Sequence, residues 1–176
     1  LALVENLLSL SRLRAGVLSV VARPAALDAV VAEAALHSPG RERIVVDLPD
    51  DLPLGRVDPG LLERVCANLL ANALKHTPPG TDVIARVERD DGFVMIAVDD
   101  RGHGVQEEER EAVFELFTRG YSHAGVPRAG IGLSLVAQFA AVHGGRAWIE
   151  DQPGGGASFR VRLPLHQAAG QATPAG

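Results

Sequence analysis

Two asparagines and a lysine recur at helical spacing in the segment LLERVCANLLANALKH, residues 61–76. At about 100° per residue, Asn68, Asn72 and Lys75 fall within about 60° of one another, beside a sector of apolar side chains. A carboxamide oxygen is a hard ligand that suits Mg²⁺, and a lysine one turn further on can meet a phosphate group. The stripe therefore indicates a metal–phosphate site, the alternative being a solvated polar face of an amphipathic helix.

A second candidate is the sequence DRGHG, residues 100–104, which directly follows the apolar segment FVMIAV. Glycines let the backbone approach a ligand closely. A carboxylate at the end of a strand, here Asp100, can accept a hydrogen bond from an exocyclic amine such as adenine N6. The alternative is an acidic turn without a ligand.

The third candidate is the sequence GIGL, residues 130–133, at the start of an expected helix. Glycines there leave free N–H groups and the positive end of the helix dipole facing a ligand, which suits phosphate. The chain contains no G-x-x-x-x-G-K-[ST] sequence, which excludes a Walker P-loop. No βαβ unit with a downstream acid surrounds these glycines, which argues against a Rossmann site.

The elements that must position these residues come in mixed clusters of helix and strand patterns. Such an order disfavours a doubly wound parallel sheet. It predicts the α+β class, as a two-layer α/β sandwich in which a mixed sheet carries its helices on one face. Asp58 is expected to cap the helix that carries the stripe. The expected helices cover residues 1–16, 24–36, 59–76, 107–117 and 131–142, and the expected strands cover residues 17–22, 43–48, 54–57, 82–88, 93–98, 146–150 and 157–163.

Composition narrows the functional class. With 176 residues of which 47% are hydrophobic, the chain has the material for about one packed domain. The net charge of −5 argues against a whole-surface attraction to nucleic acid, and we expect no nucleic-acid partner. The single cysteine, Cys66, lies on the apolar side of its helix and is expected to pack there.

Taken together and in this order, the motifs resemble those of one family, the C-terminal catalytic part of bacterial two-component sensor histidine kinases. CANLLANALKHT resembles the N box of that family, DDRGHG its first glycine box, and FELFTRG its phenylalanine box. AGIGLSLV resembles the second glycine box, and PGGGASFRVRLP the terminal glycine turn and strand. The resemblance covers residues 1–164 and implies the GHKL, or Bergerat, ATP-binding fold.

The resemblance implies that ATP and Mg²⁺ are the ligands and gives each matching position a role. Asn72 would bind Mg²⁺, Asn68 would assist at the phosphates or the metal, and Lys75 would contact phosphate, so that these three form the catalytic set. Asp100 would accept a hydrogen bond from adenine N6. The other implied ATP-binding residues are His76 near the nucleotide, Gly102 and Gly104 in the pocket wall, Gly130, Ile131, Gly132 and Leu133 at the hinge of a lid, Ser158 beside the adenine, and Arg119 and Arg128, which flank the lid and are alternatively solvated loop arginines.

Position 68 bears on the implied activity. ATPases of the same fold, the gyrase, Hsp90 and MutL relatives, place a glutamate four residues before the metal-binding asparagine. Here that residue is Asn68, whose amide has no useful basicity, and Glu63 is expected on the far side of the helix. The resemblance therefore implies phosphoryl transfer to a histidine, for relay to a response-regulator aspartate. An ATP-binding sensor and an anti-sigma-type serine kinase of the same fold are the alternatives.

The histidines themselves do not fit the acceptor pattern of the family. None of the six is followed by an acidic residue and a nearby proline. The resemblance thus implies that the phospho-acceptor histidine lies on a dimerisation domain outside this sequence.

The resemblance also divides the chain. Residues 1–16 resemble the end of the second dimerisation helix, residues 17–166 the catalytic domain, and residues 167–176 are expected to be a disordered tail. Because a short amphipathic helix cannot bury its stripe alone, we expect residues 1–16 to pack against a helix beyond this sequence, with Leu3, Leu7 and Leu10 partly exposed.

Further expectations concern the lid, the assembly and the location. We expect residues 120–129 to be mobile until phosphates bind. The present chain is expected to be a monomer, whereas the full-length protein would be a homodimer. The resemblance places the domain in the bacterial cytoplasm, as part of an inner-membrane or plasma-membrane sensor.

Overall fold

The computed structural model describes residues 2–16, 19–115 and 131–165, and for residues 2 and 3 it describes the backbone alone. The expected lid, the tail from residue 167 and the implied ligands Arg119, Arg128 and Gly130 lie outside this part of the chain. In chain order the elements are α1 (Ala2–Arg14), β1 (Arg23–Ala25), α2 (Leu27–His37), β2 (Ile44–Asp47), β3 (Gly55–Val57), α3 (Pro59–His76), β4 (Val83–Asp90), β5 (Phe93–Asp99), α4 (Ile131–Val142), β6 (Arg146–Asp151) and β7 (Ala157–Pro164), with short 3₁₀ turns at Arg41–Arg43, Glu107–Glu109 and Ala112–Phe114.

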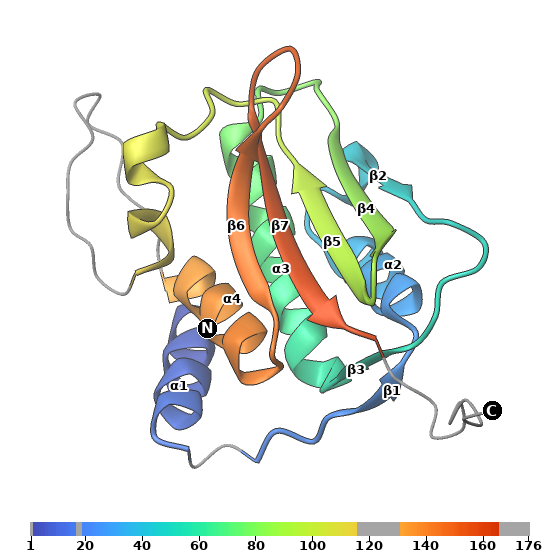
Figure 1. The fold of residues 1–176 in the computed structure, drawn as a ribbon. Helices are drawn as coiled ribbons and strands as arrows, with labels where there is room; N and C mark the ends of the chain where they lie inside the picture. Colours follow the sequence, from blue (N-terminus) through green and yellow to red (C-terminus); the bar gives the residue numbers. More distant parts are fainter. Residues whose placement is uncertain (1, 17–18, 116–130, 166–176) are drawn as a thin grey trace.

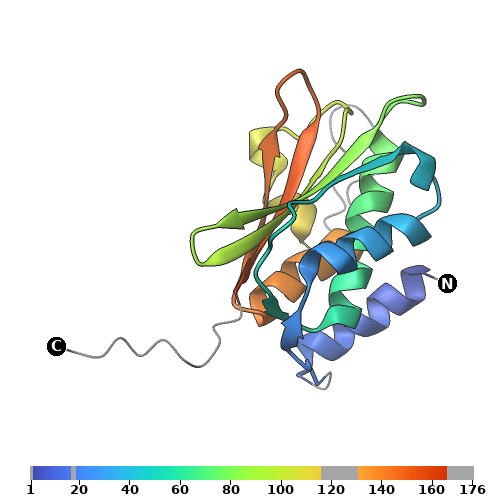
Figure 2. The same ribbon diagram turned by 90° about the vertical axis from the view of Figure 1, so that its right-hand side faces the viewer.

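The main sheet has five strands in the order β2-β4-β5-β7-β6. Strand β2 runs parallel to β4, and all other neighbours are antiparallel. A separate two-stranded sheet joins β1 to β3. Helices α2, α3 and α4 cover one face of the main sheet, so the molecule has two layers (Figures 1 and 2). The predicted α+β sandwich is therefore confirmed.

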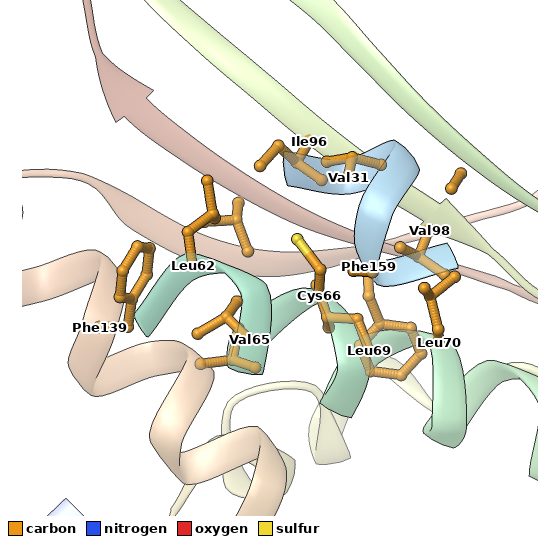
Figure 3. Packing of buried hydrophobic residues seen from close by; sticks show 14 of the residues in the cluster. Val31, Leu62, Val65, Cys66, Leu69, Leu70, Ile96, Val98, Phe139 and Phe159 are labelled. Atoms are coloured by element: carbon orange, nitrogen blue, oxygen red, sulfur yellow. The ribbon is translucent and has the colours of Figure 1, made fainter. Parts of the chain in front are cut away.

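Helix α3 lies in the middle of the helical layer, between α2 and α4, and packs on the sheet. Its apolar side chains pack against Phe139 of α4 and against the sheet residues Ile96, Val98 and Phe159, as Figure 3 shows for Leu62, Val65, Cys66, Leu69 and Leu70. Burial raises the pKa of the Cys66 thiol to about 12. The predicted packing role of this cysteine is confirmed, because Cys66 is buried within the main apolar cluster.

The start of α3 is capped as predicted. The Oδ1 atom of Asp58 accepts hydrogen bonds from the backbone N–H groups of Gly60 and Leu61, at 3.1 and 3.2 Å. Pro59 occupies the first helical position, where its missing N–H group leaves no helical hydrogen bond unmade.

Three predicted elements are wrong in detail. Residues 19–22, which are the described part of the strand expected over residues 17–22, form no strand. Pro24, expected to open a helix, lies in strand β1 of the small sheet, where a proline is tolerated because one edge of each strand needs no partner. The helix expected over residues 107–117 is replaced, in the part that the structure describes, by two 3₁₀ turns. Repulsion between the carboxylates of Glu107 and Glu111, one α-helical turn apart, disfavours an α-helix there.

Helix α1 differs most from expectation, because it packs within this chain. Leu10 and Leu13 are buried and form one cluster with Ile131 and Leu135 of α4. Leu10 is 1% exposed, so its expected exposure is wrong, whereas Leu7 is 42% exposed as expected. In Figures 1 and 2, α1 lies beside α4 and α3 on the far side from the sheet. Among the described residues no helix is both long and apolar enough to cross a bilayer.

Candidate functional site

The last two turns of α3 carry three of the predicted site residues. Asn72 and His76 are half-buried and Lys75 is exposed. The helix end is held in place by Arg43, whose guanidinium donates to the backbone carbonyl oxygens of Thr77, Pro78 and Thr81. The polar groups of this helix end therefore sit on a fixed support.

The loop that follows β5 is fastened to this helix end. The backbone N–H of Arg101 donates to Oγ1 of Thr77 at 3.0 Å. Gly102 approaches the backbone carbonyl of His76 so closely that a Cβ atom at position 102 would lie 2.6 Å from its oxygen. The structure thus joins the predicted helical stripe to the predicted glycine-rich loop through the residue type that the contact requires.

Asp100 is 3% exposed and its carboxylate has a fixed orientation. Oδ1 accepts two backbone hydrogen bonds, from Gly102 at 2.9 Å and from Ala157 at 3.0 Å. No described residue donates to Oδ2. A carboxylate held by one oxygen in this way offers the other as an acceptor, which fits the exocyclic amine of adenine.

His76 and His103 meet edge to face at this place, with ring centroids 5.7 Å apart. Burial, together with the neighbouring Lys75 and His103, lowers the pKa of His76. The ring is therefore mostly neutral at neutral pH and offers an uncharged aromatic surface beside Asp100.

Asn68 lies apart from this cluster, at the junction of three helices. Its Oδ1 accepts a hydrogen bond from Nδ2 of Asn6 in α1 at 2.8 Å. A Cβ atom at Gly132, in the first turn of α4, would lie 3.0 Å from the same oxygen. The side chains of Ile131 and Leu133 are buried, so only the backbone of this helix turn is suited to face a ligand.

The structure does not bring Ser158 to the cluster. Side chains alternate along a strand, and it is Ala157 whose backbone N–H reaches Asp100. The Ser158 hydroxyl accepts a hydrogen bond from Nε of Arg160 at 3.2 Å, in register with Asp99. Counting the alternation back from the buried Phe159 would have assigned the inner side of β7 to Ala157.

Sequence reasoning missed two further participants. Thr77 fastens the loop, and Asn6 pairs with Asn68, although the two asparagines are 62 residues apart. The Thr77 contact had a local signal, because a threonine follows the stripe directly. The contact of Asn6 had none, because nothing in the pattern of α1 indicates which helix it meets.

The donor set fits a magnesium nucleotide better than a tightly bound structural metal. Among the described residues, no three His, Cys, Asp or Glu side chains gather as a metal site. Mg²⁺ commonly takes one or two protein oxygens and shares phosphate oxygens and water, so a single carboxamide such as that of Asn72 is sufficient.

Comparison with known proteins identifies the family of this chain. Residues 57–167 match the family described as "Histidine kinase-, DNA gyrase B-, and HSP90-like ATPase". The sensor protein KdpD of Rathayibacter rathayi is 39% identical over 94% of this chain, which spans 19% of that protein. The adaptive-response sensory kinase SasA of Synechococcus sp. (strain CC9311) is 36% identical over 82% of this chain, which spans 40% of that kinase.

Two solved structures show the same fold at similar identity. Full-length ShkA in complex with AMPPNP superposes with a TM-score of 0.78 at 30% identity and covers 96% of this chain, which covers 36% of ShkA. The ATP-binding domain of PrrB from Mycobacterium tuberculosis superposes with a TM-score of 0.63 at 35% identity, covering 84% of this chain and 99% of that domain. The chain belongs to the histidine kinase-, DNA gyrase B- and HSP90-like ATPase family, and within it to the ATP-binding catalytic domains of sensor histidine kinases.

Proposed function

We propose that the cluster around Asp100 binds ATP and that the domain transfers the γ-phosphoryl group to a histidine of a dimerisation domain. The observation that carries this proposal is the carboxylate of Asp100, which is buried, is held through Oδ1 and leaves Oδ2 without a described donor. Adenine N6 donates a hydrogen bond, whereas the guanine O6 atom at the same place accepts one. The site is therefore selective for adenine over guanine.

In this proposal, side chains of α3 and backbone N–H groups at the start of α4 bind the metal ion and the phosphates. Asn72 would hold Mg²⁺ through its carboxamide oxygen, and Lys75 would contact phosphate as a point charge. Backbone N–H groups at Ile131, Gly132 and Leu133 would face the phosphates. His76, Gly102 and Gly104 would form the wall near the base. The family resemblance gives Arg119, Arg128 and the N–H group of Gly130, which lie outside the described residues, contacts with phosphate. When bound, Mg-ATP supplies the phosphoryl group and neutralises the charge that develops during its transfer.

Transfer is favoured over hydrolysis because the site offers no general base. The position that would activate a water molecule is Asn68, and its amide cannot accept a proton at neutral pH. Glu63 is exposed on α3, nine residues before Asn72, which places it about 180° around the helix. An acceptor histidine brings its own nucleophilic nitrogen, so positioning and charge neutralisation are then sufficient.

The partners follow from this activity. Residues 1–16 would be the end of a dimerisation helix and residues 17–166 the catalytic domain, in a protein that is a homodimer when complete. A response-regulator aspartate would receive the phosphoryl group. The relatives named as a sensor protein and a sensory kinase support a role in a signalling protein. In this proposal the domain lies on the cytoplasmic side of a membrane-anchored bacterial sensor.

The experiment is a transfer assay in two pieces. The present chain is mixed with Mg-ATP labelled on the γ-phosphate and with a folded, dimeric acceptor that carries the dimerisation helices of the same protein. We expect an acid-labile, base-stable label on the acceptor and very slow hydrolysis by the chain alone. Asn72→Asp should abolish transfer, because a new carboxylate beside the phosphates alters metal binding and charge, whereas Gln106→Glu adds the same charge on an exposed loop and should not.

Two outcomes would contradict the proposal. One is steady ATP hydrolysis by the chain alone that Asn68→Ala leaves intact, which would favour an ATPase. The other is a failure to label the dimeric acceptor at saturating Mg-ATP, which would favour an ATP-binding sensor.

A further inference from the structure

The glycine loop, residues 100–104, is held on a second side by the β6–β7 turn, residues 152–156. The backbone N–H of Asp100 donates to the carbonyl oxygen of Ala157 at 2.9 Å, and the backbone N–H of Ala157 donates to Oδ1 of Asp100 at 3.0 Å. Figure 1 shows the turn and the loop after β5 at the same end of the main sheet. The orientation of the Asp100 carboxylate therefore depends on where the turn places Ala157.

Gly156 brings the turn into direct contact with the glycine loop. This residue is buried, and a Cβ atom there would overlap the carbonyl oxygen of Asp100 and lie 2.8 Å from the carbonyl carbon. Gly155 has the same φ of +101°, but no described residue beyond its chain neighbours lies within 4 Å of the place of its Cβ atom. The two glycines share this φ value, which favours glycine, and only Gly156 sets the distance between turn and loop.

Two arginine side chains fasten the turn from the side of the glycine loop. Nη1 of Arg101 donates to the carbonyl oxygen of Pro153 at 3.1 Å, while the backbone N–H of Arg101 is held by Thr77 at the end of α3. Nη2 of Arg110 pairs with Oδ1 of Asp151 at 2.6 Å, and Nε of Arg110 donates to a backbone carbonyl just after the glycine loop at 3.2 Å. The turn is thus joined through Arg101 to the end of α3, and through Arg110 to the chain that follows the loop.

We propose that Arg101 and Arg110 are positioning residues for adenine recognition. They clasp the β6–β7 turn against the glycine loop, so that the N–H group of Ala157 fixes one oxygen of Asp100 and leaves the other for the exocyclic amine of adenine. The inference rests on the proposed function, because it requires that Asp100 binds adenine. A carboxylate that loses the Ala157 N–H group can rotate, and the discrimination between adenine N6 and guanine O6 then falls. Both arginines act through Asp100 and need no contact with the nucleotide.

The test compares ATP with GTP, because the positioning role changes the ratio of their affinities. Each nucleotide competes, with Mg²⁺, against a fluorescent ATP analogue bound to the whole chain. Arg101→Met keeps most of the length of the side chain but removes the donor, and we expect it to bind ATP roughly 3- to 10-fold more weakly, with GTP binding unchanged. Arg101→Lys retains a donor for the Pro153 carbonyl oxygen and should restore most of the affinity for ATP. Arg89→Met removes the same charge from an exposed position at the far end of the main sheet and should behave like the wild type.

Amide hydrogen exchange without nucleotide gives a readout that does not depend on binding. The amide of Ala157 is buried and donates to Asp100. We expect this amide to exchange faster in Arg101→Met and in Arg110→Met, and at the wild-type rate in Arg89→Met. Urea unfolding of each variant, monitored by far-UV circular dichroism, shows that the domain remains folded.

A pair of glycine variants tests the contact between turn and loop from the other side. Gly156→Ala and Gly155→Ala both place alanine at a φ of +101°, so they share the backbone strain. Only Gly156→Ala pushes the glycine loop away, and we expect only this variant to reduce the preference for ATP over GTP. If Gly156→Ala does not fold, the arginine variants carry the test.

The outcomes separate the clasp from the proposed function. If the wild type prefers ATP, but Arg101→Met keeps the same preference and the same exchange rate at Ala157, the clasp is wrong and the proposed function stands. Equal weakening of ATP and GTP in Arg101→Met would also contradict the clasp, because it would assign this arginine a charge contact with phosphate. If the wild type binds neither nucleotide, the proposed function is wrong and the positioning role falls with it.

Discussion

Nε2 of His143, at the end of α4, accepts a hydrogen bond from the backbone N–H of Asp58, the residue that caps α3, at 3.0 Å. Nδ1 of the same ring lies 2.8 Å from the carbonyl oxygen of Phe139, one turn earlier in α4. The two contacts together require a neutral ring with its proton on Nδ1, because a protonated Nε2 could no longer accept. His143 therefore joins the two core helices only in its uncharged form.

The first prediction is a loss of stability in acid that depends on His143. Burial lowers the pKa of His143 below its ordinary value of 6.5. The unfolded chain therefore takes up a proton first as the pH falls through about 6.5, so this contribution to stability is complete above that pH and is lost below it. We expect His143→Gln to reduce the difference in unfolding free energy between about pH 8 and about pH 5.5, as measured by urea titration.

The control for this prediction is His37→Gln at the exposed end of α2. His37 lies 3.5 Å from Glu33 on the surface. An exposed pair of this kind contributes little, so the variant should keep the pH dependence of the wild type. An equal pH dependence in His143→Gln and the wild type would contradict the assignment.

The second prediction concerns nucleotide selectivity. Asp100→Asn can keep the two backbone hydrogen bonds to Oδ1 and so should fold normally, but it turns an amide N–H₂ group towards the adenine amine. We expect ATP binding to weaken by about 10-fold or more and the preference for ATP over GTP to shrink. Competition against a fluorescent ATP analogue measures both. Asp91→Asn, at a hairpin position with a φ of +24° that asparagine tolerates, is the control, and equal binding of ATP and GTP by the wild type would overturn the role of Asp100.

The third prediction tests the close approach of the glycine loop to α3. In Gly102→Ala the new Cβ atom would press on the carbonyl oxygen of His76, and backbone atoms cannot swing aside as a flexible side chain can. The loop must shift, so we expect ATP affinity to fall by about 10-fold, with a loss of stability of about 1–3 kcal/mol. Gly60→Ala, in the first turn of α3, is the matched control. The new Cβ atom there would lie 3.6 Å from Oδ1 of Asp58, which is an ordinary van der Waals distance. Unchanged ATP affinity in Gly102→Ala would show that the approach does not shape the site.

The fourth prediction concerns the cap of α3. Asp58→Ala removes the acceptor of the Gly60 and Leu61 N–H groups and of the Val21 N–H group in the linker after α1. We expect a loss of about 1–2 kcal/mol in the free energy of unfolding, measured in urea. Asp58→Asn keeps one oxygen acceptor and should retain most of that stability, and an equal loss in both variants would show that the cap contributes through its charge instead.

Local patterns in the sequence determined much of this protein. The residues from Leu61 to His76 carry their apolar and polar sides at fixed helical angles, and Asp58 and Pro59 mark where that helix begins. The apolar run of β5 and the alternation in β7 mark buried strands. Each of these signals depends on neighbours a few positions apart, so it survives without knowledge of the fold. The same holds for the glycine loop, where the spacing of Asp100 and Gly102 closes a local hydrogen bond.

Only the tertiary structure decided which distant groups meet. Asn68 has the same sequence neighbours whether its amide faces a nucleotide or Asn6, so the sequence pattern does not show which partner it contacts. Leu10 and Leu13 of α1 are buried because they pack on Ile131 and Leu135 of α4. Likewise the backbone N–H of Ala157 reaches Asp100 because β5 and β7 pair in the register that sets Asp99 opposite Ser158. Such contacts join segments tens of residues apart, and their partners are chosen by packing of the whole molecule and not by any local pattern.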